Sequence, residues 1–293
     1  MTWTKYANNP VLGGDYGTCF DLSMIHEDGK FKMWFSWRPK KSIGYTESLD
    51  GFNWSEPVVV LADNPESGWE DDLNRVSVVR KGDLYHMWYT GQTNEPEASR
   101  IGYVQSQDGI HWTRVREQPV LVSEEPWEKV AVMVPQVIWD EQLNLYRMWY
   151  SAGEQYEPNA IGYATSEDGI AWVKESSNPI FTKDLSNEWE RHKVAGAQVF
   201  KHGRWHYMFY IGFEDEHTAR IGIARSTDGI SNWEKYPANP IVEPTPGEWD
   251  GEAVYKPFVL KRGDKWFLWY NGRNGALEQI GVAIFEGEHF WND

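Results

Sequence analysis

Carboxylate, guanidinium and ammonium side chains share one position in five repeated stretches of the chain. When the stretches are aligned by the Met/Leu-Trp/Phe pair that follows, this position holds Asp21, Arg75, Val134, Gly196 and Lys256. An unpaired charge is costly inside a protein, so an ordinary core would not collect three charged residues here. The pattern predicts either a salt-bridge network that ties the repeats together or a site where carboxylates work beside cationic groups in acid–base chemistry.

Two neighbouring positions add further polar groups to this cluster. Four residues earlier stand Gly17, Asp71, Val130, His192 and Glu252. Two residues later stand Ser23, Ser77, Gln136, Gln198 and Phe258. Carboxylates, amides and an imidazole are thereby expected around the charged position.

The elements that must position these residues belong to an internal repeat. IGYATSEDGIAW, which starts at Ile161, has near-copies starting at Ile43, Ile101 and Ile221 and a truncated copy starting at Ile280. Self-similarity at a fixed period of this kind, here about 60 residues, indicates an architecture of equal supersecondary units.

Each repeat contains the same sequence of strand and turn signals. An apolar stretch such as MVPQVIW leads through a turn such as HEDGK or KRGD into an aromatic stretch such as RMWYSAG. The IGYATS stretch follows, and Ser-x-Asp-Gly then turns the chain into a last strand that begins near a Trp. Short runs of β-branched and aromatic residues between Gly and Asp turns predict strands, and no helical period is visible.

The sequence therefore predicts five four-stranded antiparallel meanders, packed radially as an all-β, five-bladed β-propeller. The N-terminal stretch MTWTKYANNPVL matches IHWTRVREQPVL at Trp3/Trp112, Thr4/Thr113 and Pro10/Pro119. It is expected to supply the fourth strand of the C-terminal blade and so close the ring. Residues 1–293 would form one domain.

The two faces of such a molecule should differ in role. The Ser-x-Asp-Gly turns are nearly identical, and their Asp and Gly satisfy the turn locally, so we expect them to be structural. The loops between the second and third strands vary from repeat to repeat, as functional loops on a repeated scaffold do. Their polar residues are Arg38, Gln92, Glu95, Glu154, Glu214, Asp215, His217 and Arg273, and Trp37 and Tyr156 could stack on a ligand ring.

Composition excludes several classes of partner. The net charge of −16 argues against nucleic acid and against an anionic membrane surface. No apolar run is long enough to span a membrane and no leader is visible. Cys19 is the only cysteine, which rules out an internal disulfide and fits a reducing compartment, so a cytoplasmic location is expected. The sequence says nothing about oligomeric state.

These motifs resemble a known group of enzymes over the whole chain. FDLSMIHEDGKFKMWFS, with Asp21 at the head of the first inner strand, is similar to the Asp-Pro-x-Val/Ile-Ile strand of glycoside hydrolase family 43. The five-bladed layout looks like that of families 43, 62, 32, 68, 117 and 130. The resemblance implies a carbohydrate substrate, with Asp21 as general base or nucleophile and a second carboxyl group as the acid.

The chain departs from the family pattern at the acid. Where family 43 has Glu-Gly-Pro, this chain reads Ala195-Gly196-Ala197, and the Arg-Asp-Pro of family 32 is Asn74-Arg75-Val76. An acid beside a basic or apolar neighbour can have the altered pKa that proton donation requires. Glu252 and Asp71 are the leading catalytic candidates besides Asp21. Expected substrate contacts are Arg75, His192, Lys256, Arg38, Gln136, Gln198, Tyr255, Arg273, Asp72 and Glu214, of which Asp72 and Glu214 are also reserve candidates for the acid.

Three functions remain open at this stage. The first is a glycoside hydrolase that acts on a small glycan or glycoside. The second is a glycoside phosphorylase or transglycosylase on the same fold, since Arg side chains suit phosphate or an anionic sugar. The third is a carbohydrate-binding propeller without activity, which the missing family-43 Glu suggests, and fold alone does not settle function. No cofactor is expected. The first strands of the predicted propeller would line a central channel, and a structural cation could lie there, with His192 as one ligand.

Overall fold

The computed structural model describes residues 1–155 and 158–291, which form β-strands and five short 3-10 helices. The chain divides into two compact units. We call Asp21–Thr182 the middle unit and Met1–Phe20 with Lys183–Asp293 the terminal unit. The single domain over residues 1–293 stays a prediction. Among the described residues, no helix is both long enough and apolar enough to cross a membrane.

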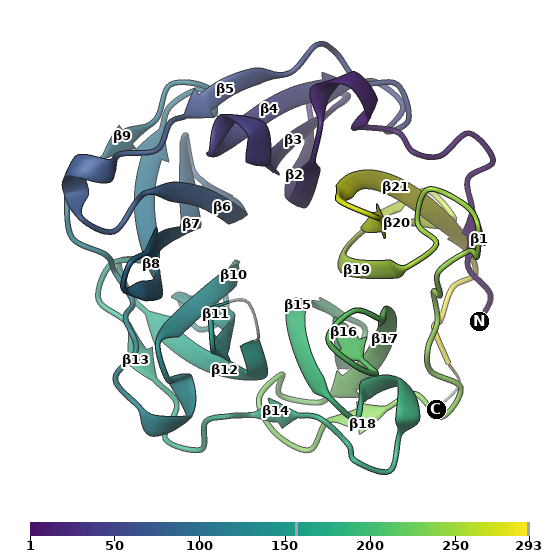
Figure 1. Ribbon diagram of the computed structural model, residues 1–293. Coiled ribbons are helices and arrows are strands. Elements are labelled where there is room, and N and C mark those ends of the chain that lie inside the picture. The colour runs from purple at the N-terminus through teal and green to yellow at the C-terminus, as the bar shows by residue number, and fades with distance from the viewer. Residues whose placement is uncertain (156–157, 292–293) are drawn as a thin grey trace. The chain divides into compact units, whose positions relative to one another are not determined.

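The middle unit begins with a four-stranded antiparallel sheet, labelled in Figure 1. Its order is β2 (Cys19–Glu27, within which the unit boundary falls), β3 (Lys30–Trp37), β4 (Ser42–Ser48) and β5 (Val58–Leu61), and η2 (Arg38–Lys40) follows β3. The sequence places the last strand near Trp54, but it begins at Val58. The Ser55 N–H donates to the Glu47 carbonyl of β4 at 2.9 Å, but Pro57 lacks the N–H that a strand ladder needs, so the continuous ladder with β4 begins at Val58.

The rest of the middle unit is a nine-stranded sheet made of two antiparallel meanders. A parallel bridge between Ala131 and Ser99 joins them. The first meander comprises β6 (Asp72–Lys81), β7 (Leu84–Asn94), β8 (Glu97–Ser106) and β9 (Thr113–Arg114). The second comprises β10 (Ala131–Asp140), β11 (Leu145–Gly153), β12 (Pro158–Ser166) and β13 (Val173–Lys174), with β14 (Phe181–Thr182) also paired to β12. The helices η3 (Pro65–Ser67) and η4 (Pro126–Glu128) precede β6 and β10.

The terminal unit contains two four-stranded sheets. One has the order β15 (Lys193–His202), β16 (Trp205–Phe213), β17 (Ala219–Ser226) and β18 (Glu234–Lys235), after η5 (Glu188–Glu190). The other has the order β19 (Ala253–Arg262), β20 (Lys265–Asn274), β21 (Leu277–Glu286) and β1 (Thr4–Lys5), with η1 (Gly14–Tyr16) after β1. Thr4 pairs with Ile284. The N-terminal strand is therefore the outer strand of the C-terminal sheet, as the sequence match predicts.

Buried tryptophans connect the core to the Ser-x-Asp-Gly turns. Trp34 and Trp88 are fully buried, and their indole N–H groups donate to the carbonyl oxygens of Gly109 and Gly169, each at 2.8 Å. Within such a turn, Asp108 Oδ1 accepts hydrogen bonds from the backbone N–H groups of Ile110 and His111 at 2.9 and 2.8 Å. These turns satisfy their own backbone and serve as hairpins, as expected.

The acid that follows Trp in the segments before β6, β10, β15 and β19 is also structural. Glu190 is fully buried and accepts hydrogen bonds from Tyr210 Oη at 2.9 Å and Lys235 Nζ at 2.8 Å. Glu70, Glu128 and Asp250 have equivalent Tyr and Lys or Arg partners. Trp189 covers Gly222, where a Cβ would lie 2.4 Å from the indole. The Gly of the IGY motif therefore makes room for this Trp, and Glu190 ties η5 to the strands β16 and β18.

Candidate functional site

The charged position identified by alignment has a left-handed backbone in every repeat, and the backbone is strained wherever the residue is not glycine. Its residues have a left-handed φ, of 48° at Asp21, 56° at Arg75, 54° at Val134, 59° at Gly196 and 50° at Lys256. Positive φ is uncommon for a residue with a side chain and a real outlier for a β-branched one such as Val134. The strand pairing shifts register around four of these residues, which marks a β-bulge. Bulges and strained residues of this kind are concentrated next to active sites.

In the middle unit, side chains of the preceding repeat hold the strained backbone through hydrogen bonds. Ser36 Oγ accepts a hydrogen bond from the Arg75 N–H at 2.7 Å, and Thr90 Oγ1 accepts one from the Val134 N–H at 3.1 Å. These hydroxyls lie on the second strand of each meander. The bulge is therefore fixed by neighbouring strands, which aims its side chain in a defined direction.

Asp21 and Arg75 form an ion pair at consecutive bulges. Asp21 Oδ2 lies 3.3 Å from Arg75 Nε, and Asp21 is 5% exposed. Arg75 Nη1 also donates to Asn74 Oδ1 at 2.6 Å. The structure thus brings together two residues that the sequence predicts for the site, one as base or nucleophile and one as a substrate contact.

Asp72 lies at the start of β6, beside the same arginine. Burial raises the pKa of Asp72 above its ordinary value, although the nearby positive charge of Arg38 opposes the shift. Asn74 Nδ2 lies 3.5 Å from Asp72 Oδ1. The other cationic groups whose charge reaches this carboxyl are Arg75 and Lys41. Burial favours the protonated form of this carboxyl group, which a proton donor needs, while the cations oppose it.

Asn74 is a residue of this cluster that sequence reasoning did not select. It is buried, and its Nδ2 donates to Gln92 Oε1 at 2.6 Å, while Gln92 Nε2 donates to Ser99 Oγ at 3.2 Å. This chain of amides holds Arg75 in place. The available signal was its position, because Asn74 stands where family 32 has the Arg of Arg-Asp-Pro.

The other predicted residues of the middle unit stand before β6, on η2, on β10 and at the end of β3. Asp71 is half-buried, and its backbone N–H donates to the Gln92 carbonyl at 2.9 Å. Arg38 is exposed on η2, and Gln136 is half-buried on β10. Trp37 is buried, with Lys40 Nζ 5.7 Å from its ring centroid, and Tyr156 lies outside the described residues.

In the terminal unit, two predicted residues lie at the bulges of β15 and β19. Lys256 is 3% exposed, and its Cδ lies 3.5 Å from the position that a Cβ on Gly196 would occupy. Gln198 donates to the Val259 carbonyl at 3.1 Å and accepts from the Val259 N–H at 2.5 Å. Its amide therefore ties β15 to β19, and its contact with substrate stays a prediction.

His192 immediately precedes β15, and Tyr255 lies near the start of β19. Both are half-buried. The His192 backbone N–H donates to the Phe213 carbonyl at 2.9 Å. The adjacent Lys193 was not selected from the sequence, yet it is 2% exposed, with Nζ 4.3 Å from the Phe213 ring centroid. The signal for it is a lysine within the otherwise apolar stretch KVAGAQVF. No three metal-binding side chains gather anywhere in the described part of the chain, and the predicted cation stays a prediction.

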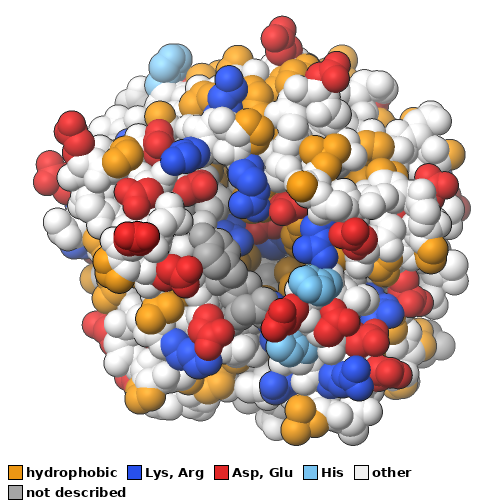
Figure 2. Space-filling view, in the orientation of Figure 1, with side chains coloured by type: hydrophobic (Ala, Val, Ile, Leu, Met, Phe, Trp, Pro, Cys, Tyr) orange, Lys and Arg blue, Asp and Glu red, His pale blue; other side chains and the backbone are white. Residues whose placement is uncertain are grey.

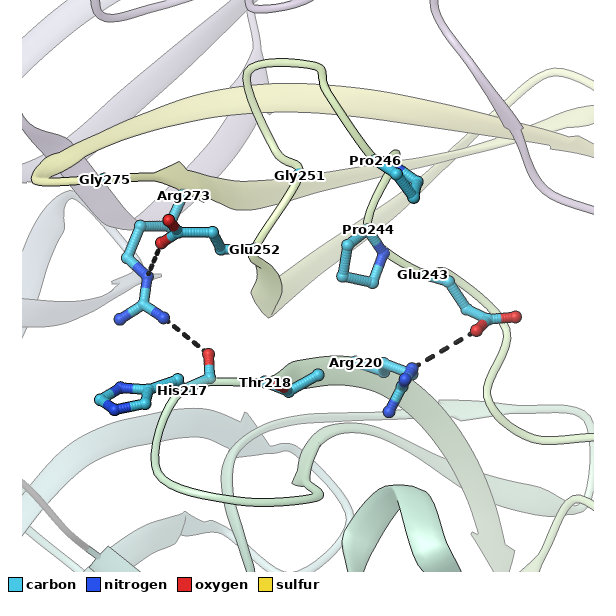
Figure 3. Close-up of a pocket in the computed structure, with 10 residues that line it drawn as sticks. All are labelled: His217, Thr218, Arg220, Glu243, Pro244, Pro246, Gly251, Glu252, Arg273 and Gly275. Atoms are coloured by element: carbon cyan, nitrogen blue, oxygen red, sulfur yellow. Dashed lines mark hydrogen bonds and ion pairs between the residues drawn. The ribbon is translucent and has the colours of Figure 1, made fainter.

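Glu252, Arg273 and Glu214 belong to a surface region of the terminal unit. Glu252 is exposed, and its Oε2 lies 3.6 Å from Arg273 Nε. Glu214 Oε2 accepts from Arg220 Nη1 at 2.7 Å. Glu252 and Arg273 line a pocket of about 720 Å³ together with His217, Thr218, Arg220, Glu243, Pro244, Pro246, Gly251 and Gly275 (Figure 3).

The surface around these sites carries both signs of charge. Figure 2 shows acidic side chains spread over one face, with Lys and Arg among them. The acidic excess matches the net charge of −16. Such a surface suits a neutral or cationic ligand better than a polyanion.

Comparison with known proteins identifies relatives over most of the chain. A 1,2-beta-oligomannan phosphorylase of Thermoanaerobacter sp. (strain X514) is 28% identical over 243 residues, which is 78% of this chain and 74% of that protein. A beta-1,2-mannobiose phosphorylase of the same strain is 27% identical over 251 residues, with the same shares covered. An uncharacterized protein of Mycobacterium tuberculosis (strain ATCC 25618 / H37Rv) is 28% identical over 221 residues, covering 72% of this chain and 70% of its own length.

Solved structures show the fold. A glycoside hydrolase superposes with a TM-score of 0.81 at 17% identity, covering 99% of this chain and 94% of its own. A thermostable family-43 glycoside hydrolase gives a TM-score of 0.75 at 17% identity, covering 96% and 92%. The resemblance to the propeller glycoside hydrolases is thereby confirmed. Residues 23–191 match the family described as glycosyl hydrolases family 32 N-terminal domain, and the chain belongs to that family.

Proposed function

We propose that this protein is a glycoside hydrolase that acts on a small glycan, with Asp72 as proton donor and Asp21 as base or nucleophile. One observation carries the proposal. Arg75 interacts with both carboxyl groups, as the ion-pair partner of Asp21 at 3.3 Å and as a charge near Asp72, whose pKa burial raises. Glycoside hydrolysis needs such a pair, in which one carboxyl group holds a proton and the other is ionised.

The proposed reaction uses the two carboxyl groups in turn. Asp72 gives its proton to the glycosidic oxygen as the bond from that oxygen to the anomeric carbon breaks. As that bond breaks, Asp21 either takes a proton from the water that attacks the anomeric carbon or itself bonds to that carbon. In the second case water then releases the sugar from Asp21 and gives its proton to the Asp72 carboxylate. Arg75 and Asn74 would hold both groups in place.

Asp72 is preferred to the two acids that lead in the sequence analysis. Glu252 is exposed and faces Arg273, whereas Asp72 is partly withdrawn from water at the head of an inner strand. Asp71 precedes β6 and stays the nearest alternative.

We also propose that the protein is a five-bladed β-propeller. Each blade would be built on one repeat, with β1 completing the last of them.

Phosphorolysis is a second candidate, and a specific observation favours it. The charges of Arg38, Arg75 and Lys41 all reach Asp72, and such a cationic group could hold a phosphate beside the anomeric carbon. Two relatives carry the names of phosphorylases that act on 1,2-beta-oligomannan and beta-1,2-mannobiose. In that reaction phosphate replaces water, and the product is a sugar 1-phosphate.

Turnover of a glycoside panel with and without phosphate tests both candidates. The panel contains nitrophenyl glycosides and short oligosaccharides, including 1,2-β-linked mannobiose. Hydrolysis without phosphate, lost in Asp72→Asn and Asp21→Asn, is expected. Asp83→Asn is a matched control, because Asp83 is exposed in the turn between β6 and β7.

The products separate the outcomes. Release of a sugar 1-phosphate only when phosphate is present would replace hydrolysis by phosphorolysis. Retained turnover in Asp72→Asn would refute its role as the acid. Binding of a sugar without turnover of any panel member would indicate a carbohydrate-binding protein instead.

A further inference from the structure

The pocket between the loops of the terminal unit is lined by two arginines that already have carboxylate partners, and Arg220 has a second one in Glu214 at 2.7 Å. Arg220 Nε lies 3.3 Å from Glu243 Oε2, and Arg273 Nε lies 3.6 Å from Glu252 Oε2. Figure 3 shows these two ion pairs on opposite sides of the pocket. A charged ligand would have to compete with an internal partner for either arginine. A neutral ligand that both donates and accepts hydrogen bonds can use the pairs as they stand.

The Arg273 side of the pocket is incompletely hydrogen-bonded. Arg273 Nη2 donates to the His217 carbonyl at 2.6 Å, but Nε has no hydrogen-bond acceptor among the described residues. A separation of 3.6 Å from Glu252 is too long for a hydrogen bond. Arg273 and Glu252 therefore form an ion pair without a hydrogen bond. A ligand hydroxyl could bridge them by donating to the Glu252 carboxylate and accepting from the Arg273 guanidinium.

The remaining wall suits the carbon skeleton of a sugar. Pro244 and Pro246 present apolar rings between the two ion pairs, while Thr218 adds a hydroxyl-bearing side chain on the opposite side (Figure 3). A volume of about 720 Å³ falls in the range of small-ligand pockets. None of the described lining residues is Trp, Tyr or Phe, so the pocket offers no flat platform for an aromatic ligand.

We infer that this pocket binds a neutral oligosaccharide through hydroxyl contacts to the Arg273–Glu252 and Arg220–Glu243 pairs. The inference rests on the proposed function for the class of ligand, but it requires no turnover at Asp72 and Asp21. It assigns Glu252 and Arg273 to sugar binding, whichever carboxyl groups act on the glycosidic bond.

Calorimetry on the Asp72→Asn variant tests the pocket separately from catalysis. The probes are neutral tetrasaccharides of glucose, mannose, galactose and arabinose. Arg273→Met should weaken binding of the recognised tetrasaccharide about tenfold, the loss expected for a hydrogen bond to a charged group. Glu252→Gln keeps the shape of the side chain and should weaken binding severalfold. Arg262→Met is the matched control, because Arg262 is exposed at the end of β19, and it should bind as the parent does.

Hydrogen exchange places the ligand. Addition of the bound tetrasaccharide should slow exchange in residues 214–218 and 273–277, the loops beside the pocket. Unchanged affinity in both Arg273→Met and Glu252→Gln, or no binding by any of the four probes, would overturn the inference. Turnover is measured separately on the wild-type protein, so loss of the proposed reaction leaves the binding result interpretable.

Discussion

Asp21 Oδ2 lies 3.3 Å from Arg75 Nε, and the two residues hold the same strained position in consecutive repeats. The repeat thus serves two purposes. Its identical turns build the sheets, and its variable bulges place one chosen side chain each. The carboxylate of Asp21 in one repeat and the guanidinium of Arg75 in the next meet because the two bulges occupy equivalent positions.

Arg75 should be essential to turnover without being essential to folding. Arg75→Met removes the partner of Asp21 and the anchor of Asn74, and we expect kcat to fall about 100-fold or more, as for loss of a charged group at a reacting centre. Arg75→Lys keeps the charge but not the fork, so it should recover part of this loss. Arg116→Met, at an exposed position, is the control. Equal kcat values in Arg75→Met and wild type would contradict the assignment.

The pH dependence should report Asp72. Because burial raises its pKa, Asp72 stays protonated to a higher pH than an ordinary aspartate, and kcat should fall as pH rises through this pKa. The same shift makes the folded state bind the proton more tightly than the unfolded state. Its contribution to stability is therefore present at low pH and lost as pH rises through the folded pKa.

Two measurements check the Asp72 prediction. The descending limb of the pH–rate profile should be absent from the residual activity of Asp72→Asn. In thermal unfolding, the stability of Asp72→Asn relative to wild type should increase as pH rises from 4 to 7. A constant difference over this range would show that the raised pKa is not a property of Asp72.

The strand order and the equivalent positions of this fold can be predicted from the sequence, because the repeats can be aligned with one another. The shared position of Asp21, Arg75 and Lys256 was found from a following aromatic pair, and its left-handed backbone confirms the register. The likeness to propeller glycoside hydrolases was equally visible. Such features depend on local patterns, which an internal repeat displays several times.

Contacts between side chains from different strands could not be read in this way. Asn74 joins Arg75 to Gln92 through amide hydrogen bonds that depend on rotamers. Glu190 follows Trp189 in a segment between strands, yet it is buried against Tyr210 and Lys235. Burial and partner choice are set by packing between strands far apart in the chain, which spacing alone does not determine.

The buried Glu190 should make Lys235 important for stability. Lys235→Met leaves a fully buried carboxylate with only the neutral partners Tyr210 and Asn187, and breaking a buried ion pair in this way costs about 3 kcal/mol. Lys235→Met/Glu190→Gln removes both charges and should recover most of the loss. Urea unfolding of the two variants measures it. A double variant less stable than Lys235→Met would show that the tyrosine contact, not the ion pair, dominates.

Glu27 should make the fold sensitive to acid. Burial opposes its ionisation, but hydrogen bonds from Lys32, Tyr85 and Arg80 outweigh this and lower the pKa of Glu27 to about 2. A depressed pKa stabilises the fold above the ordinary value of 4.5, and this stability is lost as pH falls towards 2. Glu27→Gln should cost about 2 kcal/mol at pH 7, from the weaker hydrogen bonds of a neutral group.

Unfolding of Glu27→Gln between pH 7 and pH 2 gives the check. The difference from wild type should shrink below pH 4.5 and vanish near pH 2. Glu56→Gln, at an exposed position, should show no such trend. A difference that persists unchanged at pH 2 would mean that the side chain acts through packing rather than charge.

Substitutions of Val134 test whether the bulge is strained. If it is, the glycine variant should be more stable than the alanine variant, the reverse of their usual order in a strand. Val134 is buried with a φ of 54°, a conformation that costs a β-branched residue about 1–3 kcal/mol. Val134→Ala loses buried surface but keeps a side chain at positive φ, whereas Val134→Gly also relieves the strain. Glycine should therefore be more stable than alanine here by about 1 kcal/mol, opposite to their order inside an ordinary strand. At the equivalent position Gly196→Ala should destabilise, since its Cβ would lie 2.4 Å from Ile211 Cδ1. Denaturant unfolding of the three variants decides, and an alanine variant more stable than glycine at position 134 would show that this bulge carries no strain.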